Sequence, residues 1–177
     1  MNGDIEQRLR ALEDEASIHR LAARFSDAVN ERNEEAFVQL WSPNHAVWRI
    51  GPPLPSLAEG RDAITALLRT LYGIERYFMQ LTHSGVIEVV GDRATARFVI
   101  REHGRGSDTY YDNLAVYNDE LVREKSGWCF AQRSYTYRFL NQKPFDETAF
   151  DVAPVARHGA PAEERPGYLH AQSRSFP

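Results

Sequence analysis

At 177 residues, the chain is long enough for one hydrophobic core and short for two domains. Its 42% hydrophobic and 26% charged residues are ordinary usage for a globular protein. The formal net charge is −4 and the basic residues are scattered among acidic ones, which argues against the basic stripe of a nucleic-acid binder. Cys129 is the only cysteine, so an internal disulfide and a multi-cysteine metal site are excluded.

The first residues, MNGDIEQRLRALEDE, are charged and lack the apolar centre of a signal peptide. No apolar run approaches the roughly 18 residues that a membrane span requires. We therefore expect a cytoplasmic protein that binds neither nucleic acid nor membrane.

Three helices are predicted in the first part of the chain, over residues 4–33, 34–41 and 60–73. The first has one apolar stripe at helical spacing, formed by Ile18, Leu21, Ala22, Phe25, Ala28 and Val29. A second apolar set either extends this stripe or packs on another subunit: Ile5, Leu9 and Leu12. The third helix has Ile64, Leu67, Leu68 and Leu71 on one face.

Strands dominate the rest of the pattern. Residues 45–50 predict a short strand, and residues 51–60 predict a loop because their prolines cannot join a regular ladder. Four long antiparallel strands are expected over residues 78–90, 93–103, 109–124 and 127–140. Gly91-Asp92 is a tight hairpin signal between the first two of them. Helices followed by strands predict an α+β fold in which a curved antiparallel sheet wraps the helices.

The composition changes after about residue 140. Residues 141–177 are polar and rich in proline, with no sustained period. We expect one domain over residues 1–140, followed by an extended tail that is loose, covers the pocket mouth or lies on a neighbour.

Three segments carry a family pattern: a helix–helix–strand opening over residues 18–48, THSGVIEVVGDRATARF over 82–98, and GWCFAQRSYTYRF over 127–139. Together they resemble the NTF2-like superfamily, in its SnoaL-like and scytalone-dehydratase-like branch, over about residues 5–140. The resemblance implies a cone-shaped fold around a pocket for a small organic ligand, and a homo-dimer or homo-trimer. It does not fix the function, because relatives include dehydratases, isomerases, cyclases, hydrolases and non-catalytic domains.

The dehydratase-like pocket of this branch uses two histidines, an aspartate on the first long helix, an asparagine and several tyrosines. By this resemblance His83 and His103 match the histidines, and Asn113 matches the asparagine. Asn30 stands at the aspartate position, and Asp27 lies three residues earlier on the same helix.

Further residues are expected to contact the ligand: Phe25, Trp48, Arg49, Tyr111, Tyr135 and Tyr137. Arg49 takes the position of the usual pocket tyrosine on the first strand. Tyr110 and Tyr111 must point to opposite faces of their strand, so at most one enters the pocket, whereas Tyr135 and Tyr137 share a face.

Dehydration or isomerisation beside a carbonyl needs a base for a C–H proton and donors for the resulting enolate. A histidine suits the base because its ordinary pKa, about 6.5, lies near working pH. The hypothesis is that His83 is the base, oriented by Asn30 or Asp27, with His103 and Asn113 at the carbonyl or the leaving hydroxyl. Structural roles are the alternative, since Asn30 is also placed to cap a helix and Asp27 to be a solvated charge.

The leading functional prediction is a cofactor-free lyase or isomerase acting on a small, largely apolar or aromatic carbonyl compound. No histidine spacing indicates a metal, and no glycine-rich phosphate loop is present. The alternatives are an epoxide-opening cyclase or hydrolase, a non-catalytic small-molecule-binding module, and the small subunit of an aromatic-ring dioxygenase.

Overall fold

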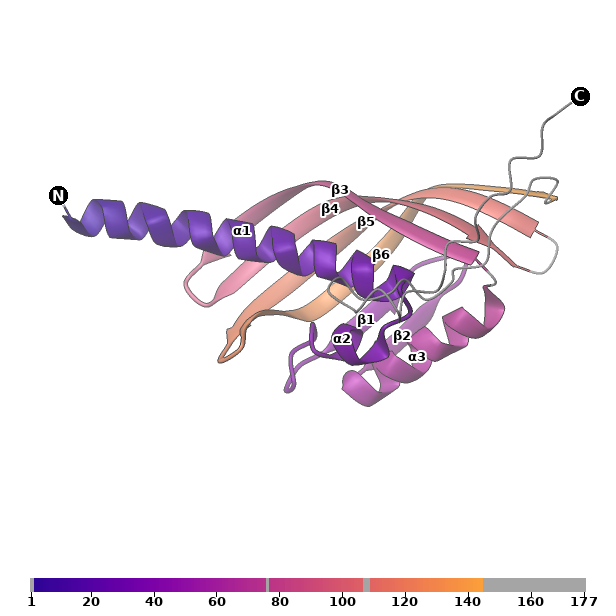
Figure 1. The fold of residues 1–177 in the computed structure, drawn as a ribbon, viewed down its shortest axis with the longest axis horizontal. Helices are drawn as coiled ribbons and strands as arrows, with labels where there is room; N and C mark the ends of the chain where they lie inside the picture. Colours follow the sequence, from indigo (N-terminus) through magenta and orange to yellow (C-terminus); the bar gives the residue numbers. More distant parts are fainter. Residues whose placement is uncertain (1, 76, 107–108, 145–177) are drawn as a thin grey trace, which may run out of the picture.

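The computed structural model of the chain describes residues 2–75, 77–106 and 109–144. These residues form, in chain order, α1 (Asn2–Asn30), α2 (Glu34–Val38), β1 (Val47–Ile50), β2 (Ser56–Glu59), α3 (Arg61–Ile74), β3 (Tyr77–Val90), β4 (Arg93–Arg105), β5 (Thr109–Glu124) and β6 (Gly127–Pro144). The helices lie against one face of a curved sheet (Figure 1). The predicted α+β class with N-terminal helices is confirmed.

The sheet has six strands in the order β2-β1-β6-β5-β4-β3. Strands β3 to β6 pair antiparallel, as the hairpin signals predict, and Gly91 takes a positive φ of 61° in the first turn. The expectation of a fully antiparallel sheet is wrong at one place, since β1 pairs with β6 in parallel. The chain leaves β1 through β2 and α3 and returns through three long strands, so β6 arrives beside β1 in the same direction.

The predicted loop over residues 51–60 contains a short strand. Residues 56–59 form β2, which pairs antiparallel with β1 at the edge of the sheet. All prolines of this segment precede the strand, so none of them interrupts its hydrogen bonds. A strand at the edge of a sheet also pairs with a neighbour on one side only.

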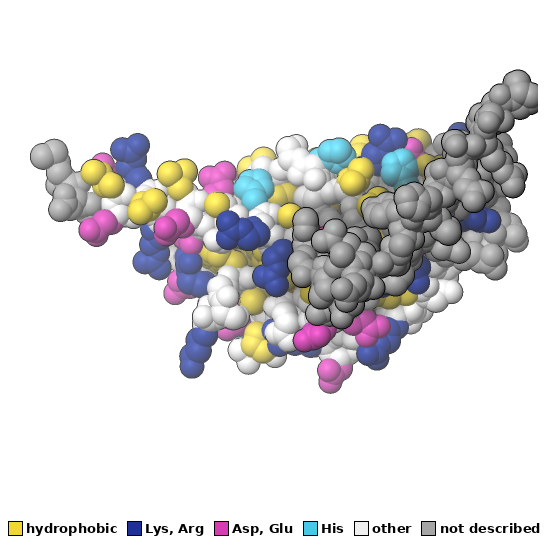
Figure 2. All heavy atoms as spheres, viewed as in Figure 1, with side chains coloured by type: hydrophobic (Ala, Val, Ile, Leu, Met, Phe, Trp, Pro, Cys, Tyr) yellow, Lys and Arg dark blue, Asp and Glu magenta, His cyan; other side chains and the backbone are white. Residues whose placement is uncertain are grey.

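The predicted apolar stripe of α1 is buried in full, and α1 lies along β3. Ile5, Leu9 and Leu12 differ, because they are exposed on the part of α1 that extends past the sheet (Figures 1 and 2). They do not extend the core of this chain. Their packing on another subunit stays a prediction.

A buried ion pair supports the centre of the core. Arg133 is fully buried, and its guanidinium donates to both carboxylate oxygens of Asp119 at 2.9 and 3.1 Å. The same guanidinium lies about 4 Å from the ring centroids of Phe25, Tyr117 and Phe130. The pair thereby fixes two rings, Phe25 and Tyr117, that also border the pocket described below.

Strand β6 continues to Pro144, past the expected domain end at residue 140. The tail predicted over residues 141–177 falls, from residue 145 onward, outside the described residues. None of the described helices combines the length and the hydropathy that crossing a bilayer requires.

Candidate functional site

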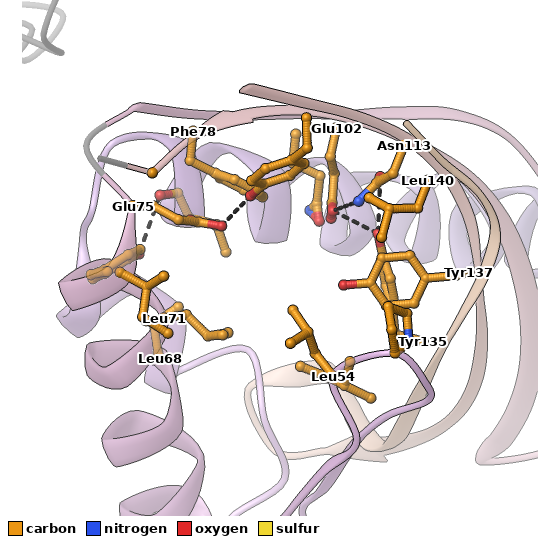
Figure 3. Close-up of a pocket in the computed structure, with 18 of the residues that line it drawn as sticks. Leu54, Leu68, Leu71, Glu75, Phe78, Glu102, Asn113, Tyr135, Tyr137 and Leu140 are labelled. Atoms are coloured by element: carbon orange, nitrogen blue, oxygen red, sulfur yellow. Dashed lines mark hydrogen bonds between the residues drawn. The ribbon is translucent and has the colours of Figure 1, made fainter. Parts of the chain in front are cut away.

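A pocket of about 580 Å³ lies between α3, the segment after β1 and the inner face of the sheet (Figure 3). Its walls are mainly apolar, with side chains from these parts and from the end of α1: Val29, Leu54, Leu68, Leu71, Phe78 and Leu140. The volume is within the usual range of small-molecule sites. A hollow of this size with apolar walls fits a mid-sized organic ligand.

Glu102 is the most deeply buried acid of the pocket. It lies on β4 directly opposite Asn113 of β5, so the two side chains are neighbours on the inner face. The hydroxyl of Tyr135 donates to Oε2 of Glu102 at 2.6 Å, and Nδ2 of Asn113 donates to the same oxygen at 3.0 Å. Both hydrogen bonds go to Oε2, which leaves Oε1 as the oxygen for a proton or a ligand.

Glu75 is the second acid. It follows the last residue of α3 in an extended conformation, and its carboxylate accepts a hydrogen bond from the hydroxyl of Tyr111 on β5. Gly104 makes this contact possible, because a Cβ at that position would collide with the Tyr111 ring. The absence of a side chain on β4 therefore lets the phenol lie across the strand and reach Glu75.

Burial governs the protonation of both acids. It raises the pKa of Glu75 to about 7, against the hydrogen bond from Tyr111, which lowers it. Burial also raises the pKa of Glu102, although Tyr135 and Asn113 both stabilise its charged form. The pocket thus holds one carboxyl poised to exchange its proton near neutral pH and a second whose burial also shifts it toward the neutral acid.

Phenol groups provide the other polar atoms. The rings of Tyr117, Tyr135 and Tyr137 form a series of edge-to-face contacts with centroids 4.9 Å apart. Figure 3 shows the Tyr137 hydroxyl directed into the hollow. Burial raises the pKa of Tyr137, so this hydroxyl keeps its proton and is a hydrogen-bond donor.

The structure brings together several of the residues that the sequence singles out. Those that line the pocket are Phe25, Trp48, Tyr111, Asn113, Tyr135 and Tyr137. Tyr110, the neighbour of Tyr111, is on the opposite face of β5, as strand alternation requires. Their roles toward a ligand stay predictions.

His83 lies elsewhere. It is exposed on β3 and is not among the residues that line the pocket, so the expectation that its ring projects into the hollow is wrong. The pairing of β3 with β4 shifts between Thr82 and Gly85, and Thr82 turns inward to meet Ser26 of α1 at 2.6 Å. His83 consequently faces outward, and histidine side chains are visible on the molecular surface (Figure 2).

His103 also misses the pocket. It alternates with Glu102 along β4 and so projects from the outer face, where Nδ1 lies 2.6 Å from the Tyr110 hydroxyl and 3.7 Å from Asp112. The expected pairing of His103 with Asn113 at a substrate is therefore wrong. Asn113 is instead bound to Glu102.

Asn30 has a structural role. Its side-chain amide donates to the carbonyl of Gln80 at 2.9 Å and accepts from the Gln80 amide at 2.7 Å, which joins the end of α1 to β3. Asp27 is exposed on α1. Arg49 is exposed between two residues that line the pocket, because successive side chains of β1 point to opposite faces. None of the three lines the pocket, and Asn30 is bound to Gln80 and not to His83.

The acids themselves are absent from the sequence-based expectations. For Glu102 a signal exists, since Ala94, Ala96, Phe98 and Ile100 all face inward and the period of two places Glu102 with them. Glu75 has no such signal, because it lies in a connection between a helix and a strand. Among the described residues, no three metal-ligating side chains gather at one point.

The fold and the pocket define a class: a small α+β cone with an internal, aromatic-lined pocket that carries two acids. The chain belongs to the SnoaL-like domain family, whose model matches residues 10–134, and thus to the NTF2-like superfamily that the sequence resembles. The expected family is confirmed. A comparison with curated protein sequences gives no significant match.

Solved structures with the same fold include enzymes. The hexachlorocyclohexane dehydrochlorinase LinA type 2 is 19% identical, with 81% of this chain and 96% of that one covered at a TM-score of 0.71. A candidate scytalone dehydratase from Novosphingobium aromaticivorans is 18% identical, with 84% and 97% covered and a TM-score of 0.66. An NTF2-like protein from the same species is 25% identical, with 77% and 89% covered and a TM-score of 0.66. At these identities the similarity shows the common fold.

Proposed function

We propose that this protein is a cofactor-free lyase or isomerase that moves a proton on a small, largely apolar or aromatic carbonyl compound. The observation that carries the proposal is a pair of buried carboxyls, Glu75 and Glu102, in one apolar pocket, each with a pKa that burial raises. Carboxyls whose pKa is raised by burial are a common basis for acid–base catalysis. The named activities of two solved relatives, a dehydrochlorinase and a candidate dehydratase, are also eliminations.

Glu75 is the proposed base. Its pKa of about 7 leaves a substantial fraction charged at neutral pH while keeping the carboxylate a stronger base than an exposed one. The charged carboxylate takes a proton from the carbon beside the carbonyl, and the electron pair of that C–H bond moves to the carbonyl oxygen. The Tyr111 hydroxyl holds the carboxylate in place.

Glu102 and Tyr137 are the proposed donors. In this proposal Glu102 is protonated at Oε1, and this acid and the hydroxyl of Tyr137 supply hydrogen bonds to the enolate oxygen in a mainly apolar pocket. Return of the proton from Glu75 to a different carbon completes an isomerisation. In an elimination, the electron pair returns from the carbonyl oxygen to form the C=C bond as the C–O bond to the leaving hydroxyl breaks, and Glu102 gives that oxygen its proton, so water departs. Transfer of the abstracted proton from Glu75 to Glu102 through solvent restores both groups.

The test is proton exchange. Mid-sized aromatic ketones are incubated with the protein in D₂O, and deuterium at the carbon beside the carbonyl is followed by NMR. Glu75→Gln is expected to slow enzyme-catalysed exchange by at least ~100-fold, because an amide is not a base. His83→Gln is expected to leave the rate unchanged, since that side chain is exposed on the outer face.

The matched control is Glu88→Gln, which removes an exposed carboxylate of β3. If the protein binds the ketones but produces no exchange, or if Glu75→Gln exchanges as fast as the unaltered protein, the proposed activity is refuted. In the first case the binding-module alternative takes its place.

A further inference from the structure

The pocket has an unusual charge composition. Among its described lining residues there are two carboxyls, Glu75 and Glu102, and no lysine, arginine or histidine. The remaining polar groups are neutral phenols, amides, the indole of Trp48 and a threonine hydroxyl, together with the backbone. In the described part of the lining, a ligand therefore meets acids and neutral groups.

Among the residues that the structure describes, no cation lies inside the pocket beside either acid. Glu102 is held by Tyr135 and Asn113, and Glu75 by Tyr111, all of them neutral donors. The guanidinium of Arg32 lies near Glu75; it is exposed and donates to the backbone carbonyl of Glu75 at 2.5 Å. That cation is engaged with the end of α3, outside the lining of the pocket.

From this composition we infer that the pocket selects an uncharged ligand and rejects compounds that carry a carboxylate or a phosphate, with Glu75 and Glu102 as the residues that set this specificity. An anion entering the pocket loses its hydration and gains no counter-charge, which is costly in an apolar environment. It also meets the acids, which repel it whenever they are ionised. The inference rests on the proposed function, since it assumes that the substrate occupies this pocket.

The discrimination should depend on pH. The groups that face Glu75 are Tyr72 of α3, Tyr111 of β5, Glu102 of β4 and Tyr137 of β6, with Arg32 on the solvent side. Burial raises the pKa of Tyr72, Tyr111 and Tyr137, so these phenols stay neutral over the accessible range. Glu75, with a pKa of about 7, gains charge between mildly acidic and mildly alkaline pH.

Three probes of matched shape test the inference: 2-acetylnaphthalene, 2-naphthoate and 2-naphthylmethylammonium. Their affinities for the full chain are measured by titration calorimetry at about pH 6 and about pH 8.5, on either side of the Glu75 transition. The ketone is expected to bind most tightly at both values. The carboxylate is expected to bind at least ~10-fold more weakly than the ketone, and more weakly still at the higher pH.

Variants assign the effect to the two acids. Glu75→Gln is expected to remove the pH dependence of carboxylate binding, and Glu75→Gln with Glu102→Gln is expected to bring the carboxylate to within about 3-fold of the ketone. Glu88→Gln, on the outer face, is the control and should change neither affinity.

Carboxylate binding as tight as ketone binding would overturn the inference. Tighter binding of the ammonium than of the ketone would also overturn the inference and would indicate a cation site. The failure of all three probes to bind would overturn it as well. These outcomes are independent of turnover. Ketone selectivity without deuterium exchange would refute the proposed activity alone, whereas exchange without discrimination would refute the ligand specificity alone.

Discussion

The hydroxyl of Tyr111 donates a hydrogen bond to Oε1 of Glu75, across a separation of 36 residues in the chain. The bond joins the middle of the sheet to the residue that follows α3, at the border of the pocket. It stabilises the charged carboxylate, whereas burial stabilises the neutral acid and has the larger effect. The balance of these two influences sets the pKa of Glu75 near 7.

Tyr111→Phe is expected to raise the pKa of Glu75 above about 7, because the variant keeps the burial and loses the hydrogen bond that favours the charged form. Carboxyl ¹³C NMR titration of the labelled protein measures this value directly. Tyr110→Phe is the matched control, since the adjacent phenol is on the outer face. An unchanged Glu75 titration in Tyr111→Phe would contradict the role given to this hydrogen bond.

Gly104→Ala is expected to displace the Tyr111 ring, because the added Cβ collides with it. The variant should therefore raise the pKa of Glu75 in the same direction as Tyr111→Phe, and it should also lower Tm through the strain on β4 and β5. The same NMR titration and a thermal melt check both effects. Gly73→Ala, at an exposed position of α3 with open space around its Cβ, is expected to stabilise the protein by about 0.5–1 kcal/mol. A Gly104→Ala protein with unchanged Glu75 titration would rule out this packing argument.

Stability is expected to fall as pH rises from mildly acidic to mildly alkaline. Burial raises the pKa of Glu102 and Glu75 in the folded protein above the values of the unfolded chain. For each acid, the folded state therefore binds more protons than the unfolded state at any pH between the unfolded and the folded pKa. The stability that this acid contributes is lost as the pH rises through its folded pKa.

Calorimetric melts at about pH 5.5 and about pH 8.5 measure this loss as a lower Tm at the higher pH. Glu102→Gln keeps an oxygen that accepts from Tyr135 and Asn113 but cannot ionise, so its Tm should fall less over the same interval. Glu88→Gln, an exposed change, should leave the fall as it is. Equal falls in Glu102→Gln and in the unaltered protein would show that Glu102 does not contribute.

Asn30→Asp is expected to destabilise the protein by about 1–3 kcal/mol. The carboxylate still accepts from the Gln80 amide, but it faces the Gln80 carbonyl without the donor that Nδ2 provides. Urea unfolding measures the change. Asp27→Asn, one turn earlier and exposed, is expected to change stability by less than about 0.5 kcal/mol. If the two substitutions have equal effects, Asn30 does not anchor α1 to β3.

The sequence alone determines the elements and their class. The apolar stripe of α1 and the long alternating strands are local patterns, since each period of 3.6 or 2 reflects the face that one element must bury. The alternation of side chains along each strand also predicts part of the site, because it places Tyr111, Asn113 and Glu102 on inward positions.

Tertiary structure decided the rest. The side to which His83 points depends on an irregularity in the pairing of β3 with β4, where the period of two is interrupted and parity no longer predicts the face. Glu75 enters the pocket because α3 packs below the sheet and Gly104 leaves room for Tyr111, contacts between segments far apart in the chain. The raised pKa values of the two acids follow from burial, which only the assembled pocket creates.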